Sequence, residues 1–151
     1  MKDRELDILF EVVRTVESGG NKKAFRIEPA FAERINTNDR AYKRAQHTVY
    51  AYDQSLRLYL ATSVTSVQIL IYNLYFYDRL YWWQKIGNKI ASIPYVLSDD
   101  DEKELFVFYL LEKGINFFPF NSKSDLELFA KGYNGSVEYA DKLLEVYMSY
   151  V

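Results

Sequence analysis

Hydrophobic residues near the start of the chain recur at spacings of three and four, namely Leu6, Leu9, Phe10, Val13 and Val16. This spacing places them on one face and predicts an amphipathic helix over residues 6–16. Glu17 and Ser18 follow, and then Gly19 and Gly20, which tolerate the left-handed backbone angles that end a helix. We therefore expect Glu17 in the last turn of this helix, beside a flexible loop.

The middle of the chain has a less regular pattern. Pro29 argues against a long helix that begins before it, and a short β-hairpin fits between Lys22 and Thr37. A helix is predicted over residues 39–52, and Asp53 can cap the next one.

Residues 58–77 form an uncharged stretch of 20 residues, which is long enough to span a bilayer. Six hydrogen-bonding side chains interrupt it: Thr62, Ser63, Thr65, Ser66, Gln68 and Asn73. The stretch therefore predicts a buried helix, a polar turn and a second buried helix, with no membrane insertion.

Helix signals dominate the C-terminal half. Ser98 and the acids at 99–101 open a helix that Gly114 ends, because acids favour the positive end of the helix dipole. Ser124 and Glu127 form a capping box for a helix ended by Gly132, and Ser136 caps a last helix. The chain shows no repeat or linker, so we predict one all-α domain spanning residues 1–151.

Composition excludes several function classes. The net charge is -2 without a basic stripe, which argues against nucleic acid as the partner. There is no Cys and only His47, and the acids at 99–101 are explained by a helix start, so no metal or cofactor is expected. Residues 1–5 are too charged to begin a signal peptide.

Aromatic residues make up 17% of the chain, with 14 Tyr. Most of those between residues 72 and 83 are expected in the core. They exceed what one helix face can bury, so some are expected to be exposed or to meet a partner.

Four segments, in order, resemble a known family. The segment at 16–21, Val-Glu-Ser-Gly-Gly-Asn, resembles the Glu-Ser-Gly motif of goose-type lysozymes and lytic transglycosylases, and more so the N-acetylmuramidase domain of phage endolysins. Residues 25–31 are similar to the family's Phe-Glu-Arg-His-x-Phe stretch, with Glu28 at the glutamate. Residues 63–73 are similar to Ser-x-Gly-x-Phe-Gln-Ile-Met-Gly-x-Asn, and residues 129–135 to the closing Tyr-Asn-Gly motif, followed by Tyr139 and Lys142.

The resemblance implies a lysozyme-like fold that cleaves the β-1,4 bond between N-acetylmuramic acid and N-acetylglucosamine in peptidoglycan. It implies that Glu17 is the catalytic acid. Such an acid must stay protonated near neutral pH, and burial against apolar groups raises a carboxyl pKa, a tuning for which lysozyme is the standard example. The alternative is a solvated carboxylate, although a helix C-terminus is an unfavourable place for one.

A second carboxylate would hold a water or attack directly. The candidates are Glu28, Glu33, Asp39 and Asp53. Glu28 is favoured because it matches a family position, and a salt bridge to Arg26 or Arg34 is the alternative interpretation. If no second acid faces the site, Glu17 acts alone, as in the transglycosylases, and the product is an anhydro sugar.

The expected substrate-binding residues are Ser63, Thr65, Gln68, Tyr133 and Asn134. Ser63, Thr65 and Gln68 can hydrogen-bond sugar hydroxyls and acetamido groups. For Gln68 the alternative is an amide that satisfies a loop backbone, and for Tyr133 and Asn134 it is a turn before Gly135.

Two positions depart from the family, because its glycines correspond to Thr65 and Ile71 here. They favour an alternative function, a lysozyme-like domain with weakened catalysis that serves as a structural or wall-binding part of a phage virion. The leading hypothesis is a peptidoglycan glycosidase, either a free endolysin in the host cytoplasm before release or a lysin carried on the virion beside other tail proteins. An unrelated helical interaction module would require all four motif matches to be coincidence.

Overall fold

The fold is mainly helical, as predicted. A computed structural model describes residues 3–89, 97–115, 122–136 and 138–150. The helices within these ranges are α1 (Asp3–Ser18), α2 (Pro29–Arg34), α3 (Arg40–Gln46), α4 (Asp53–Leu60), α5 (Ile71–Phe76), α6 (Asp78–Gly87), α7 (Asp99–Lys113), α8 (Lys123–Asn134) and α9 (Tyr139–Met148). The strands are β1 (Phe25–Ile27), β2 (Thr62–Val64) and β3 (Ile69–Leu70), which form one antiparallel sheet in that order.

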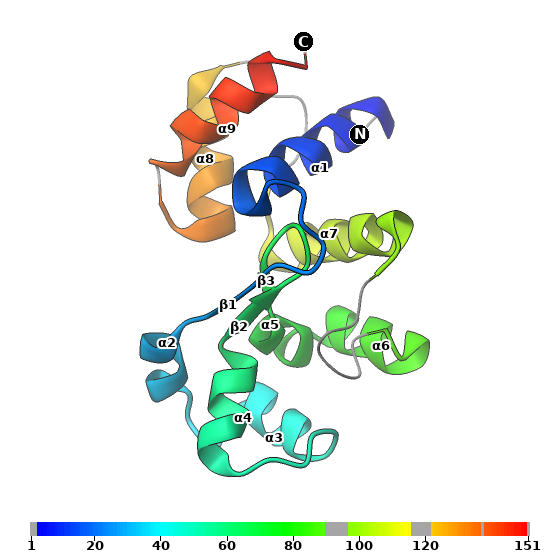
Figure 1. Ribbon diagram of the computed structural model, residues 1–151, viewed down its shortest axis with the longest axis vertical. Helices are drawn as coiled ribbons and strands as arrows, with labels where there is room; N and C mark the ends of the chain where they lie inside the picture. Colours follow the sequence, from blue (N-terminus) through cyan, green and yellow to red (C-terminus); the bar gives the residue numbers. More distant parts are fainter. Residues whose placement is uncertain (1–2, 90–96, 116–121, 137, 151) are drawn as a thin grey trace.

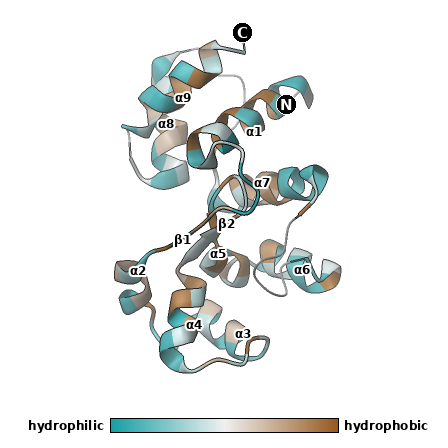
Figure 2. Ribbon diagram, in the orientation of Figure 1, coloured by the Kyte–Doolittle hydropathy of each residue, from teal (hydrophilic) through white to brown (hydrophobic). Residues whose placement is uncertain are grey.

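The elements form an elongated molecule. Helices α1, α8 and α9 lie at one end, α2, α3 and α4 lie at the other, and the sheet and α7 lie between them (Figure 1). Most helices carry hydrophobic and hydrophilic segments along their length (Figure 2), as expected for amphipathic elements. Within the described ranges, no helix combines the length and apolar character needed to cross a membrane.

Helix α1 ends where the sequence indicates. The amide of Gly19 donates to the carbonyl of Thr15, and that of Gly20 donates to the carbonyl of Arg14, with both glycines at positive φ. These bonds satisfy carbonyls that would otherwise be free at the helix end. Glu17 therefore lies in the last turn of α1, as predicted.

The sheet departs from the expected local arrangement. A strand lies within residues 22–37, but β1 pairs with β2, with Phe25 opposite Val64 and Ile27 opposite Thr62. The hairpin itself is β2–β3, where Val64 faces Ile69 across a loop of residues 65–68. The helix–turn–helix prediction for residues 58–77 is therefore wrong in its middle. Residues 62–64 are buried on both faces, so the alternation that signals a strand is missing.

Capping in the C-terminal half is partly as expected. The hydroxyl of Ser98 accepts from the amide of Asp101, and Gly114 follows α7 in the left-handed conformation. Helix α8 is capped by Ser122 rather than by Ser124, and it continues through Gly132 to Asn134. The N-cap of α9 is Glu138 rather than Ser136, whose hydroxyl accepts from the amide of Glu138.

Two hydrophobic clusters form the core. The first contains Phe10, Phe106 and Phe129 and joins α1, α7, α8 and α9. The second contains Tyr42 and Leu60 and joins α3, α4 and α5. The hairpin and α5 contribute to both clusters, so they connect the two ends of the molecule. The expected split of the aromatic run is also present, because Tyr75 and Trp83 are buried whereas Trp82 is exposed.

Candidate active site

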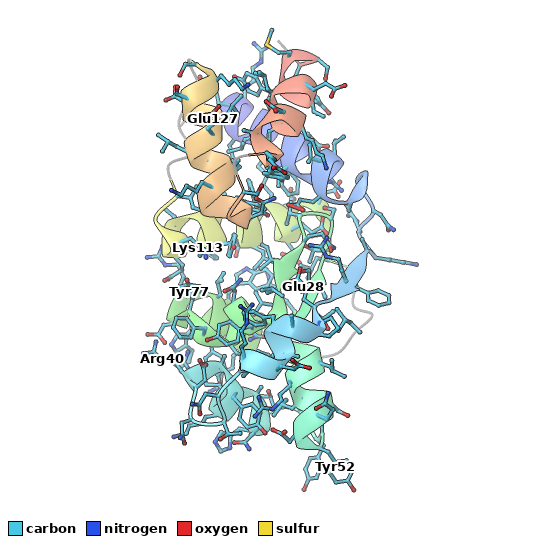
Figure 3. The ribbon with its side chains drawn as sticks, turned by 90° about the vertical axis from the view of Figure 1, so that its left-hand side faces the viewer. Glu28, Arg40, Tyr52, Tyr77, Lys113 and Glu127 are labelled. Carbon is cyan, nitrogen blue, oxygen red and sulfur yellow. The ribbon has the colours of Figure 1, made fainter. Side chains whose placement is uncertain are left out.

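A cleft of about 680 Å³ crosses the molecule between the two ends. Its walls come from the end of α1, from β1, α2 and the hairpin, from α5, and from the C-terminal parts of α7 and α8 with the start of α9. Figure 3 shows Glu28, Tyr77 and Lys113 near the middle of the long axis, where these elements meet. Six of the seven predicted site residues line the cleft: Glu17, Glu28, Ser63, Gln68, Tyr133 and Asn134.

Glu17 lies half-buried in the cleft wall, and burial raises the pKa of its carboxyl. Three neighbours oppose this rise in pKa: the Tyr139 hydroxyl, then the charges of Arg26 and Lys142. The Tyr139 hydroxyl is itself buried and, within the described residues, makes no hydrogen bond of normal geometry. Burial dominates, so the environment favours the protonated acid.

This environment predicts a pH-dependent stability. Ionising Glu17 costs more in the folded than in the unfolded chain, so stability is lost as pH rises from the ordinary pKa, 4.5, through the raised folded-state value. Glu17→Gln should therefore be more stable than wild type at neutral pH, by about 1 kcal/mol, the usual order for removing a strained functional group. Urea unfolding at several pH values measures this, with the exposed Glu33→Gln as control. A Gln variant that is less stable at neutral pH would contradict the raised pKa.

Glu28 lines the cleft at the N-cap of α2 and pairs with Arg26 at 3.1 Å. Both interpretations of Glu28 therefore remain compatible with its position. The other candidate acids do not line the cleft. Asp39 caps α3 and accepts from the Tyr72 hydroxyl, and Asp53 accepts from the Tyr42 hydroxyl and Arg57.

The loop of the hairpin is held from several sides. The side-chain nitrogen of Gln68 donates to the carbonyls of Ala24, at 3.0 Å, and Thr65, at 2.8 Å. The carbonyl of Ser66 accepts from the Ser18 hydroxyl at 2.7 Å, which fixes the loop against the end of α1. Gln68 thus satisfies loop backbone, as its alternative interpretation proposes, and it also lines the cleft.

The buried side chain of Glu102 also holds this loop. Glu102 of α7 is 0% exposed and accepts from the amide and the hydroxyl of Ser66, at 3.0 and 2.7 Å. Arg14 of α1 lies 3.7 Å from the Glu102 carboxylate. Neither residue was expected from the sequence. Glu102 follows the acids at 99–101 at the start of a helix, and nothing in that pattern indicates that it is buried.

Thr65 is the one predicted site residue outside the cleft lining. It has a φ of 70°, and its buried hydroxyl has no partner among the described residues. Left-handed backbone costs a β-branched residue about 1–2 kcal/mol, which gives a physical reason for glycine at this position in the family. Ile71 is also fully buried. Neither residue is among those that line the cleft.

The remaining predicted residues reach the cleft from β2 and α8. Ser63 pairs with Arg26 and Leu70 in the sheet. Tyr133 is 6% exposed, stacks on Phe129 and donates from its hydroxyl to the carbonyl of Val67 at 2.7 Å. Asn134 ends α8, and its side chain accepts from the amide of Ser136. Tyr133 thus combines a core position with an edge on the cleft, and Asn134 forms the predicted turn.

The cleft also contains residues that were not predicted as site residues. Four are basic: Arg26, Lys113, Lys131 and Lys142. Lys142 and Tyr139 follow the closing motif of the family, so that match was the available signal for these two. Within the described ranges, no three His, Asp or Glu side chains are grouped to hold a metal ion.

Sequence comparison agrees with an endolysin-like relationship. The chain is 29% identical over 150 residues to the endolysin of Enterobacteria phage PRD1, across 94% of this chain and 95% of that protein. No family model matches the chain, and no solved structure matches it. The similarity extends over both ends of the molecule and therefore over every wall of the cleft.

Proposed function

We propose that this protein is a peptidoglycan-lytic glycosidase that uses Glu17 as its general acid. The observation that carries the proposal is a half-buried carboxyl with a raised pKa in the wall of a large cleft. Perturbed acids in clefts are enriched at active sites. The likeness to a phage endolysin over nearly the whole chain supports the same activity.

In the proposed reaction, the glycan lies along the cleft and Glu17 donates its proton to the oxygen of the β-1,4 bond after N-acetylmuramic acid. Transfer of this proton makes the sugar a better leaving group. The amide oxygen of Gln68 accepts a hydrogen bond from the glycan, and the cleft edges of Tyr133 and Tyr77 form apolar walls. Ser63 and Asn134 supply further polar contacts.

Glu28 is the proposed second carboxylate, because it alone among Glu28, Glu33, Asp39 and Asp53 lines the cleft. In the hydrolytic route it orients the attacking water, and its ion pair with Arg26 at 3.1 Å holds its side chain in place. If Glu28 is not used, Glu17 acts alone and the product is an anhydro sugar.

The proposed substrate is bacterial peptidoglycan, and residues 1–151 act as one lysozyme-like domain. The protein is made in the host cytoplasm and reaches the wall on release, or it is carried there by other virion proteins. Neither nucleic acid nor a cofactor takes part in the proposed reaction.

Wall-clearing assays test the proposal. Purified protein should lower the turbidity of a cell-wall suspension and release soluble muropeptides. Mass spectrometry of the fragments distinguishes the two routes. Hydrolysis leaves reducing ends, whereas transglycosylation leaves anhydro ends, which are lighter by one water. Protein that leaves walls of several chemistries intact would refute the proposed activity.

A further inference from the structure

Three lysines lie around the same cleft without a carboxylate partner. Lys113 is in the last turn of α7, Lys131 is in the last turn of α8, and Lys142 lies in α9. All three are exposed and line the cleft, and none forms a salt bridge within the described ranges. Figure 3 labels Lys113 close to the level of Glu28 and Tyr77. We call these residues the lysine rim.

Within the part of the chain that the structure describes, no acid forms an ion pair with the lysine rim. Asp141, beside Lys142 in sequence, pairs with Lys123 at 3.0 Å. Among the described residues that line the cleft, the acids are Glu17 and Glu28, which four basic residues outnumber, and Glu28 pairs with Arg26. The cleft is therefore basic in a protein whose net charge is -2. Like charges gathered in a concave surface attract anions into it.

We propose that the lysine rim is a subsite for carboxylates of the wall strand, so that the protein prefers anionic peptidoglycan to a neutral glycan. This inference rests on the proposed function. A glycan of N-acetylated sugars alone has no charge, and the carboxylates of peptidoglycan come from its peptides or from the lactyl group of muramic acid. Lysine suits such ligands, because a flexible ammonium can follow carboxylates whose positions vary.

A ligand bound at the lysine rim also affects the pKa of Glu17. The groups that face Glu17 are Tyr139 and Lys142 from α9, Arg26 from β1, Tyr109 from α7 and Tyr133 from α8. Among them Tyr139 lowers the pKa of Glu17 most, followed by the charges of Arg26 and Lys142. A substrate carboxylate on Lys142 offsets its charge, and the bound substrate therefore favours the protonated form of Glu17.

The test compares two double variants on three substrates. Lys131→Met/Lys142→Met removes two charges from the rim, and Lys23→Met/Lys43→Met removes two exposed charges outside the cleft. The substrates are native peptidoglycan, the same material with its carboxylates converted to amides by carbodiimide and ammonia, and material stripped of peptides by an amidase. Thermal unfolding of each variant checks that it is folded.

On native walls, kcat/KM should fall about tenfold in the rim variant, as expected for two partly exposed ion pairs, mainly through KM. The control variant should match wild type. On amidated walls, wild type should fall to the level of the rim variant, which should lose nothing further. The amidase-treated arm assigns the source, because the amidase removes the peptide carboxylates and frees a lactyl carboxylate in place of each peptide. An effect of the rim that is lost on this substrate comes from the peptides, and one that persists shows that the rim also binds lactyl carboxylates.

Two results would overturn the subsite. One is a loss in the rim variant that is equal on native and amidated walls, and the other is a wild type that clears both walls at the same rate. A wild type that clears neither wall instead refutes the proposed function. The pH profile adds a readout independent of binding, because Lys142→Met should move the alkaline limb of kcat/KM to higher pH.

Discussion

Glu17→Gln should lower the rate of wall lysis by about 10³-fold, within the range usual for loss of a general acid. The amide has nearly the shape of the carboxyl, so it keeps the end of α1 and the cleft wall in place, but it has no proton to give. Turbidity clearing and release of reducing or anhydro ends measure the loss. Because burial raises the pKa of Glu17, wild-type activity should fall as pH rises through that pKa.

Two matched variants show whether the effect belongs to Glu17. Glu28→Gln removes the second cleft carboxylate, and it should slow hydrolysis while leaving transglycosylation unaffected. Glu33→Gln removes the same charge from an exposed position of α2 outside the cleft, and it should match wild type. A Glu17→Gln protein with wild-type activity would remove Glu17 from the mechanism, and the proposed catalytic chemistry with it.

Local signals in the sequence predict the environment of Glu17 well. The helical spacing before it and the two glycines after it depend on neighbours in the chain, and both are confirmed by α1 and its C-terminal bonds. The cap at Ser98 is another local feature, and it is confirmed for the same reason. The four family-like motifs add information about distant residues. They single out Glu17, Gln68 and Tyr133, which line one cleft in the structure.

Features that depend on distant segments escape such signals. Strand β1 ends at Ile27 and pairs with β2, which begins at Thr62, so residues 28–61 separate the two strands and no local period predicts their pairing. Thr65 is predicted to bind substrate from a polar turn, but the structure buries its side chain outside the cleft lining. The lysine rim has the same origin, since its members come from three helices and converge only in the folded chain.

Glu102 is the strongest example of a residue that only the fold identifies, and its loss should have a large effect on stability. It is fully buried, binds Ser66 through two hydrogen bonds and faces Arg14. Glu102→Ala leaves the buried amide of Ser66 without its acceptor and breaks the hydrogen bond from the Ser66 hydroxyl, whereas Arg14 keeps its ion pair with Glu11 at 3.1 Å. A buried donor left unsatisfied costs about 1–3 kcal/mol, and Ser66 has two such donors, so we expect a large drop in the free energy of unfolding.

The matched control is Asp100→Asn, an exposed acid on the same helix, which should cost at most about 0.5 kcal/mol. Glu102→Gln separates charge from shape, because its amide oxygen still accepts from the Ser66 amide. Ser66 also accepts a hydrogen bond from Ser18 at the end of α1, next to Glu17. If Glu102 positions the loop, the folded Glu102→Gln variant should therefore have a lower kcat, and the pH at which activity is lost through ionisation of Glu17 should shift. Lower stability with unchanged kcat and pH profile would instead limit Glu102 to a structural role.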